Sequence, residues 1–327
     1  MFCIRTLAFA ALAAVPAAAG WAATAGAQEI TLRAVSSFGE GTKDSLGFEA
    51  LVAEINKRGA GRIKINYLGG APKVMSPFEV VKNLKSGVVD FANANSAFFT
   101  NVVPEADAFK LSEFGIADLR KNGAWAYMNE LLKEKANAYF LGNTLDFIAF
   151  NIYLNKPIEK ADLKGLKIRV TPIYRAMVEA LGGTAISSPP SEVYTLMERG
   201  TVDGYGWPTS GIFDYSWEKV TKYRVEPAFY SAALHALVNL DAWNKLGAER
   251  QKIMQEAMAV IEAKAGERIR LDGEERKRQE AAGIKAVQLP PAEAKKWSDT
   301  AKAAGWAAAM KTSPERVAKL KALLTKN

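Results

Sequence analysis

The pattern of hydrophobic and polar positions switches repeatedly between the period of a strand and the period of a helix. ITLRAV, which begins at Ile30, alternates as a strand, and the following SLGFEALVAEINKR carries apolar residues at helical spacing. GRIKINYL then alternates as a second strand, PFEVVKNLKSG is a helix that ends at Gly87, and VVDFANAN is a third strand. Strands that alternate with helices are typical of a parallel sheet with helices on its faces.

A second series of the same kind begins near residue 145. LDFIAFNIYLN and LKGLKIRV are strand-like, IYRAMVEALGG is a helix closed by glycines, and TAIS is a strand. SEVYTLMERG is a helix for which Ser191 is the expected N-cap, and TVDGYGW is a strand and turn that places Trp207 in the turn. No Gly/Ser linker separates the two series, so we expect two α/β lobes joined by elements that cross between them.

The last 80 residues or so are predicted to be mostly helical. Residues 248–283 interleave acidic and basic side chains and predict one long helix with a solvated face, so nucleic-acid binding is not expected. After Pro290 and Pro291, a separate helical hairpin or tail is expected.

The first 27 residues differ from the rest of the chain. Arg5 precedes an apolar, alanine-rich run, and Ala25 and Ala27 form an A-x-A site, as in a cleaved secretory signal peptide. Pro16 and Gly20 interrupt the run, which disfavours a membrane anchor. We therefore expect export to the periplasm.

Composition and charge narrow the possible chemistry. Hydrophobic residues make up 49% and charged residues 24%, as in an ordinary globular protein, and the only cysteine, Cys3, lies in the predicted signal peptide. The mature chain is then expected to lack disulfides and thiolate metal sites. Removal of Arg5 leaves 42 basic against 35 acidic residues and lowers the net charge from +8 to +7, which favours anionic ligands.

Few residues favour enzyme chemistry. The one histidine, His235, lies in the apolar segment SAALHALVNL, where a structural role is expected, and the hydrolase, zincin, P-loop and dinucleotide motifs are missing from the sequence. A secreted enzyme that uses carboxylates such as Asp203 and Glu192 is an alternative, although both fit better as ordinary turn and helix-start residues. No cofactor is expected.

Binding has better candidates, at the carboxyl ends of the predicted strands. Ligands of open α/β sheets lie beyond these ends, which here carry residues 36–38, 93–96 and 205–207 and Arg169. Alternation puts Arg169 on the same side as Lys167, which allows an exposed position, whereas its place at the end of a strand predicts a two-pronged donor for a carboxylate. The aromatic side chains near these ends are either core or the walls of a pocket.

Three segments carry a resemblance to a known family. DLKGLKIRV, LGGTAISSPPSEVYTLMERGTVDGYGW and LKSGVVDFANANS resemble the extracytoplasmic solute receptors of tripartite ATP-independent periplasmic (TRAP) transporters, the DctP family. The resemblance implies an α/β fold of two lobes with mixed sheets, a ligand cleft between the lobes and a long C-terminal helix. It divides the chain into a signal peptide (1–27), lobe I (28–150 and about 235–273) and lobe II with the C-terminal helices (151–234 and about 274–327).

The resemblance also implies a function and a binding site. Arg169 is expected to form a salt bridge with the carboxylate of an organic acid, which the protein delivers, as a monomer, to the small and large membrane subunits of a TRAP permease. The expected ligand-binding residues are Arg169, Trp207, Asn95, Phe38, Phe150, Pro190 and Tyr230. A ligand sensor that feeds a signalling partner is an alternative use of the same pocket.

Two departures from the family pattern refine the expected ligand. Metal-holding relatives carry an acid just before the tryptophan, where this chain has Gly206, so bound sodium or calcium is not expected. Sialic-acid-type relatives carry a second arginine in a segment that here holds Phe147, Ala149 and Phe150. We therefore predict a monocarboxylate with an apolar or aromatic body.

Overall fold

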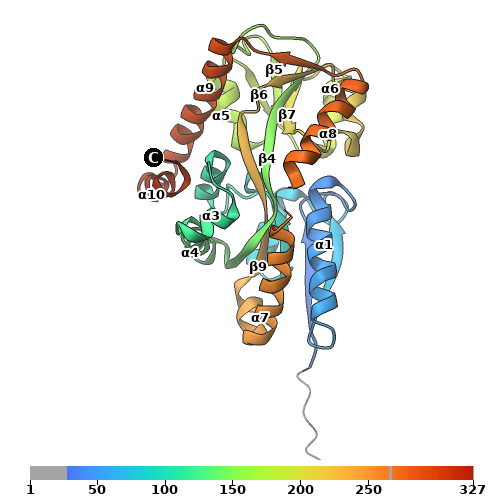
Figure 1. The fold of residues 1–327 in the computed structure, drawn as a ribbon, viewed down its shortest axis with the longest axis vertical. Helices are drawn as coiled ribbons and strands as arrows, with labels where there is room; N and C mark the ends of the chain where they lie inside the picture. Colours follow the sequence, from blue (N-terminus) through green and yellow to red (C-terminus); the bar gives the residue numbers. More distant parts are fainter. Residues whose placement is uncertain (1–27, 265–266, 327) are drawn as a thin grey trace, which may run out of the picture.

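The computed structural model describes residues 28–264 and 267–326, so the predicted signal peptide lies outside the described residues. Ten strands of the described chain form one mixed sheet in the order β2-β1-β3-β9-β4-β7-β5-β6, with β8 beside β4 and β10 beside β8 (Figure 1). The strands are β1 (Ile30–Ser36), β2 (Ile63–Gly70), β3 (Phe91–Ala94), β4 (Ala138–Leu154), β5 (Lys167–Val170), β6 (Thr184–Ser187), β7 (Gly204–Pro208), β8 (Tyr223–Glu226), β9 (Tyr230–Asn239) and β10 (Lys285–Gln288).

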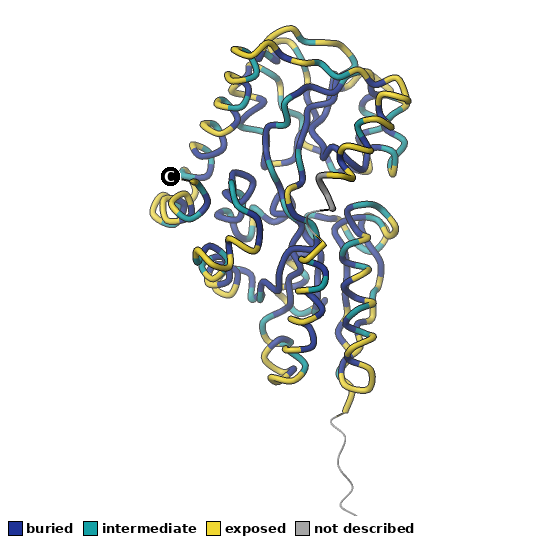
Figure 2. The backbone as a smooth tube through the Cα atoms, in the orientation of Figure 1, coloured by how far each residue is buried: buried dark blue, intermediate teal, exposed yellow. Residues whose placement is uncertain are grey.

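Helices cover both parts of this sheet. The α-helices are α1 (Lys43–Arg58), α2 (Val80–Lys85), α3 (Ile116–Lys121), α4 (Ala124–Ala136), α5 (Pro172–Ala180), α6 (Val193–Glu198), α7 (Leu240–Glu262), α8 (Glu267–Ala281), α9 (Pro291–Met310) and α10 (Pro314–Leu324). Short 3-10 helices are η1 (Pro77–Glu79), η2 (Ser96–Phe98), η3 (Pro104–Leu111), η4 (Pro190–Glu192), η5 (Ile212–Tyr215) and η6 (Trp217–Val220). Figure 2 shows buried residues along the central strands and exposed residues on the outer turns of the helices. No helix of the described residues is long and apolar enough to cross a membrane.

Two long strands connect the two halves of the sheet. The first half contains β1, β2 and β3, the second half contains β5 to β8 and β10, and β4 and β9 run through both. Within each half, the pairs β1–β2, β1–β3, β5–β6 and β5–β7 are parallel, as the alternation of strands and helices predicts. The pairs that join the halves, β3–β9, β4–β9 and β4–β7, are antiparallel. The mixed sheet implied by the resemblance is therefore confirmed.

The prediction of one helix over residues 248–283 is wrong. α7 ends at Glu262 and a separate helix, α8, begins at Glu267. The apolar face of α7, which includes Met254 and Met258, packs on the first half of the sheet, whereas α8 lies against the second half (Figure 1). A single straight helix could not cover both halves. The helical hairpin expected after Pro291 is confirmed as α9 and α10.

Two smaller local predictions are also wrong. Ser191 does not cap a helix: it lies inside η4, and α6 follows with Glu192 in the N-cap position and no side-chain cap. Trp207 does not lie in a turn but inside β7, opposite Asn151 of β4. Pairing with β4 extends β7 through Trp207, although the glycine and proline on either side of it predict a turn from local sequence.

Candidate functional site

Arg169 is the third residue of the four-residue strand β5 and is completely buried, with 0% of its surface exposed. Its guanidinium donates from Nε and Nη2 to the carbonyl oxygen of Ser188, at 3.0 and 2.5 Å, and from Nη1 to the hydroxyl of Tyr174 at 3.1 Å. Lys167, on the same side of the strand by alternation, is exposed. The solvent-exposed alternative for Arg169 is therefore wrong, because β6, β7 and α5 enclose the carboxyl end of β5.

Arg169 forms no salt bridge among the described residues. Its hydrogen-bond partners are the neutral oxygens of Ser188 and Tyr174, and they use three of its five N–H groups. A buried ion without a partner costs several kcal/mol, so this position favours an anion.

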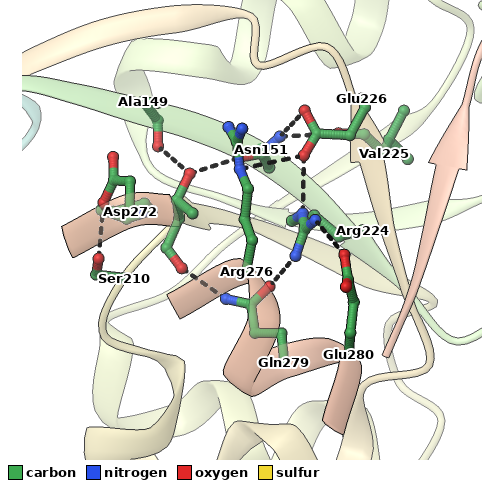
Figure 3. Close-up of polar contacts among 12 residues, drawn as sticks. Ala149, Asn151, Ser210, Arg224, Val225, Glu226, Asp272, Arg276, Gln279 and Glu280 are labelled. Carbon is green, nitrogen blue, oxygen red and sulfur yellow. Dashed lines mark hydrogen bonds and ion pairs between the residues drawn. The ribbon is translucent and has the colours of Figure 1, made fainter. Parts of the chain in front are cut away.

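A second buried arginine, Arg224 of β8, provides the contrast. Its Nε lies 2.8 Å from Oε1 of Glu226, and its Nη1 donates to Oε1 of Gln279 at 2.6 Å (Figure 3). Gln279 in turn donates to the carbonyl oxygen of Thr209 at 2.6 Å. Arg224 is thus neutralised within the protein, and its network fastens α8 to the second half of the sheet.

A cavity lies beside Arg169, between the two halves of the sheet. Its wall is formed by Phe38, Asp44, Asn95, Ala97, Phe98, Ile148, Phe150, Thr171, Tyr174, Trp207, Pro208 and Leu234. Two of these residues contact Arg169: Tyr174 accepts its hydrogen bond, and the Trp207 ring centroid lies 5.9 Å from its Cζ. The wall is mostly apolar and aromatic, and the halves of the sheet leave a volume of only about 20 Å³ between them.

Within this wall, the hydroxyl of Thr171, two residues after Arg169, and the indole N–H of Trp207 are buried without a hydrogen-bond partner among the described residues. Buried polar groups are rarely left unpaired in native structures. The cavity therefore offers a hydroxyl and an N–H donor to a ligand, next to a cation.

The expected ligand-binding residues do not all meet at this cavity. Phe38, Asn95, Phe150 and Trp207 line it, and Arg169 lies directly behind the Tyr174 and Trp207 wall. Asn95 also has a structural task, because its side chain accepts from the backbone N–H of Ala97 and donates to the carbonyl oxygen of Ala233, both at 2.9 Å.

Pro190 and Tyr230 lie elsewhere. Pro190 borders a neighbouring hollow, together with Pro72 and Tyr215. Tyr230 is buried and donates its hydroxyl proton to the carbonyl oxygen of Ala301 at 2.8 Å, which ties β9 to α9.

Sequence reasoning missed Tyr174 and Thr171. Both follow Arg169 closely, in the segment RVTPIY. Their position after the carboxyl end of a predicted strand indicates that they belong to the ligand-binding edge of the sheet. Asp44, Ile148 and Leu234 also line the cavity, but nothing in their local sequence indicates it.

A larger groove, of about 350 Å³, lies outside this cavity. It is lined mainly by α1, β4, α7 and α8, with Leu46 and Leu271 exposed at its edges. Its described lining contains no buried polar atom without a partner and no buried cation. We therefore place the candidate site at the cavity beside Arg169.

The other ionisable residues of interest have structural surroundings. Nδ1 of His235 donates a hydrogen bond to Oδ1 of Asn143 at 2.8 Å, and burial lowers the pKa of His235 to about 4. Asp203 accepts from the backbone N–H of Lys167 at 2.9 Å, and Glu192 is exposed, so neither carboxylate lines the cavity. No group of three or more His, Cys, Asp or Glu side chains in the described chain is placed to hold a metal ion.

A mixed sheet whose halves are joined by two crossing strands, with a cavity between the halves, defines the fold of an extracytoplasmic solute receptor. The fold matches a TRAP periplasmic solute-binding protein of Desulfovibrio salexigens, solved with orotic acid, with a TM-score of 0.80 and 18% identity over 90% of this chain and 97% of that one. It matches DctP7 of Bordetella pertussis, a receptor that binds pyroglutamic acid, with a TM-score of 0.80 and 17% identity over 90% and 99% of the two chains.

Sequence comparison shows the family. A profile of the bacterial extracellular solute-binding proteins of family 7, named DctP, matches residues 35–311, and this chain belongs to that family. A monocarboxylate 2-oxoacid-binding periplasmic protein of a Nostoc species is 26% identical over 248 residues, which cover 71% of this chain and 66% of that relative. The family consists of solute receptors rather than enzymes, so the carboxylate enzyme alternative is set aside.

Proposed function

We propose that this protein binds an organic monocarboxylate with an apolar or aromatic body and delivers it to a TRAP membrane permease. The buried, uncompensated guanidinium of Arg169 beside an aromatic-walled cavity carries the proposal. A ligand carboxylate would supply the missing counter-charge, and its body would fill the space between Phe38, Phe150 and Trp207.

The ligands named for the relatives support a monocarboxylate, without deciding the nature of its body. Those relatives bind orotic acid, pyroglutamic acid or monocarboxylate 2-oxoacids, each of which combines one carboxylate with a small body. Within the described cavity wall, no second arginine or lysine is present to pair with a second carboxylate. We therefore expect monocarboxylates to bind better than dicarboxylates such as succinate.

The wider biology is part of the same proposal. Residues 1–27 would direct export to the periplasm, and the small and large membrane subunits of a TRAP permease would be the partners of a monomeric receptor. The halves of the sheet would be two lobes that close over the ligand, with lobe I formed by 28–150 and about 235–273. The boundary expected near residue 273 would fall inside α8, and the contacts of α8 with Ser210 and Thr209 favour moving it to before Glu267, so that all of α8 belongs to lobe II.

The test is a thermal-shift series on the purified mature protein. A ligand that binds only the folded state raises the melting temperature. We expect a shift with some of pyruvate, phenylpyruvate, phenylacetate, benzoate and pyroglutamate, and none with the amides of the same acids. The proposal is wrong if amides and acids stabilise equally, or if dicarboxylates are the better ligands.

A further inference from the structure

The hydroxyl of Tyr174 lies between the ligand-binding arginine and the backbone of β7. It accepts a hydrogen bond from Nη1 of Arg169 at 3.1 Å and donates its only proton to the carbonyl oxygen of Gly206 at 2.8 Å. Because that proton is committed to Gly206, the hydroxyl oxygen can only accept from the guanidinium. The backbone of β7 thus sets the orientation of Arg169 through Tyr174.

The ring of Tyr174 fills the space that a side chain at position 206 would need. A Cβ built on Gly206 would lie 2.5, 2.7 and 3.0 Å from three atoms of this ring. The ring cannot move aside easily, because Tyr174 is completely buried and packs against Phe150 and Phe229, at centroid distances of 6.1 and 6.0 Å. Position 206 therefore requires glycine because the ring of Tyr174 leaves no space for a Cβ. Its backbone is not left-handed, so backbone conformation is not the reason.

We propose that Tyr174 is a positioning residue that holds Arg169 in its carboxylate-binding orientation, and that Gly206 is the complement that makes room for it. This inference rests on the proposed function and deepens it. With Nε and Nη2 held by Ser188 and Nη1 held by Tyr174, the guanidinium is fixed before the ligand arrives, and its two remaining N–H groups are directed by the protein. An acidic side chain at position 206 would displace the ring of Tyr174, and Arg169 would lose the hydrogen bond that orients it. This arrangement therefore belongs to a site in which one guanidinium recognises the carboxylate.

The first test separates positioning from packing. Tyr174→Phe keeps the ring and removes both bonds of the hydroxyl, so the affinity for a carboxylate should fall about tenfold. The probes are phenylacetate and pyruvate, titrated calorimetrically, with phenylacetamide as the neutral counterpart of phenylacetate. In an Arg169→Met background, Tyr174→Phe should cause no further loss, whereas a purely structural defect would persist there.

Tyr153→Phe is the matched control. Tyr153 is also completely buried, and its hydroxyl donates to backbone carbonyls, at 3.1 Å to Pro208 and 3.2 Å to Thr209, without contacting Arg169 or lining the cavity. This variant should lose stability but keep its affinity. If Tyr174→Phe behaves like Tyr153→Phe while Arg169→Met weakens the binding of phenylacetate, the inference is overturned and the proposed function stands. If neither acid nor any panel acid binds the wild-type protein, the proposed function itself fails.

A second test needs no ligand. Gly206→Ala should lower the melting temperature of the wild-type protein by several degrees, because the added methyl group meets the Tyr174 ring. In a Tyr174→Ala background the same substitution should cost little, because the ring is gone. Equal losses in the two backgrounds would show that the ring does not occupy this space and would overturn the inference.

Discussion

The two buried arginines should respond in opposite ways to the same substitution. Arg169 and Arg224 are equally inaccessible to solvent, at 0% and 2% exposure, but only Arg224 lies beside a carboxylate, with 2.8 Å between its Nε and Oε1 of Glu226. Methionine has a similar length, packs adaptably and carries no charge. Arg169→Met and Arg224→Met therefore remove the same charge from two buried positions, which differ mainly in whether a carboxylate forms a salt bridge with the guanidinium.

The magnitudes follow from that difference. Arg224→Met leaves the buried carboxylate of Glu226 with the amide of Asn151 at 3.4 Å and the half-exposed Arg276 at 3.5 Å, and breaking a buried pair costs about 3–5 kcal/mol of unfolding free energy. Arg169→Met removes a charge that has no counter-ion, so the ligand-free protein should lose at most about 1 kcal/mol, chiefly from the hydrogen bonds with Ser188 and Tyr174. Affinity for a carboxylate should instead fall by about 2–5 kcal/mol, or roughly 30-fold to several thousandfold.

Urea unfolding of the ligand-free proteins and calorimetric titration with the best panel acid measure the two effects separately. Arg169→Met should keep its stability and lose binding, whereas Arg224→Met should lose stability and, where it remains folded, keep binding. Retained affinity in a folded Arg169→Met protein would refute the assignment of the site. A large stability loss in that variant would show that the guanidinium is compensated within the protein after all.

Three further predictions concern other parts of the molecule. Trp207→Leu should weaken phenylacetate more than pyruvate in calorimetric titrations, because the indole ring forms an aromatic wall, and equal losses would remove the aromatic-pocket idea. His235→Gln should reduce the loss of stability between about pH 7 and about pH 5. Burial lowers the pKa of His235 from 6.5 to about 4, so the unfolded chain takes up the proton first as the pH drops. The wild-type protein therefore loses stability below pH 6.5, by up to about 3 kcal/mol near the folded-state pKa. Urea midpoints that shift with pH equally in the variant and the wild type would contradict this. Lys43→Met should weaken ligand binding about fivefold, because Lys43 Nζ on α1 forms an ion pair with Glu275 on α8, at 2.5 Å, across the two halves of the sheet. Glu275→Gln should cause the same loss of affinity, and the double variant should lose no more than either single variant.

Much of the fold could be predicted from local sequence, because strand and helix periods are local properties. The strands that end in Ser36, Ala94 and Val170 appear where the alternation of polar and apolar residues predicts them, within a few residues. The long charged segment after Leu240 could not be resolved in the same way. Its helical period continues through residues 263–283, and only the presence of two separate halves of the sheet requires α7 and α8 to be distinct helices.

The candidate site was predictable in part. Arg169 and Phe38 could be placed near the cavity because they follow from strand ends, and strand ends can be recognised in the sequence. Trp207 reaches the cavity from inside β7, where pairing with β4 decides its environment. The resemblance could suggest Pro190 and Tyr230, but the packing of α9 against β9 takes the Tyr230 hydroxyl to Ala301 instead of to the cavity wall.

The sequence by itself determined which residues carry the chemistry: an arginine at the end of a strand, aromatic side chains near it, and few candidates for catalysis. Only the tertiary structure decided which of two buried arginines would lack a partner. Arg224 lies 2.8 Å from the carboxylate of Glu226, whereas Arg169 donates only to the neutral oxygens of Ser188 and Tyr174, which α5 and the end of β6 bring to it. Charge compensation depends on distances in space, which the order of residues along the chain does not give, so only the folded chain shows that the guanidinium of Arg169 is buried among neutral oxygens.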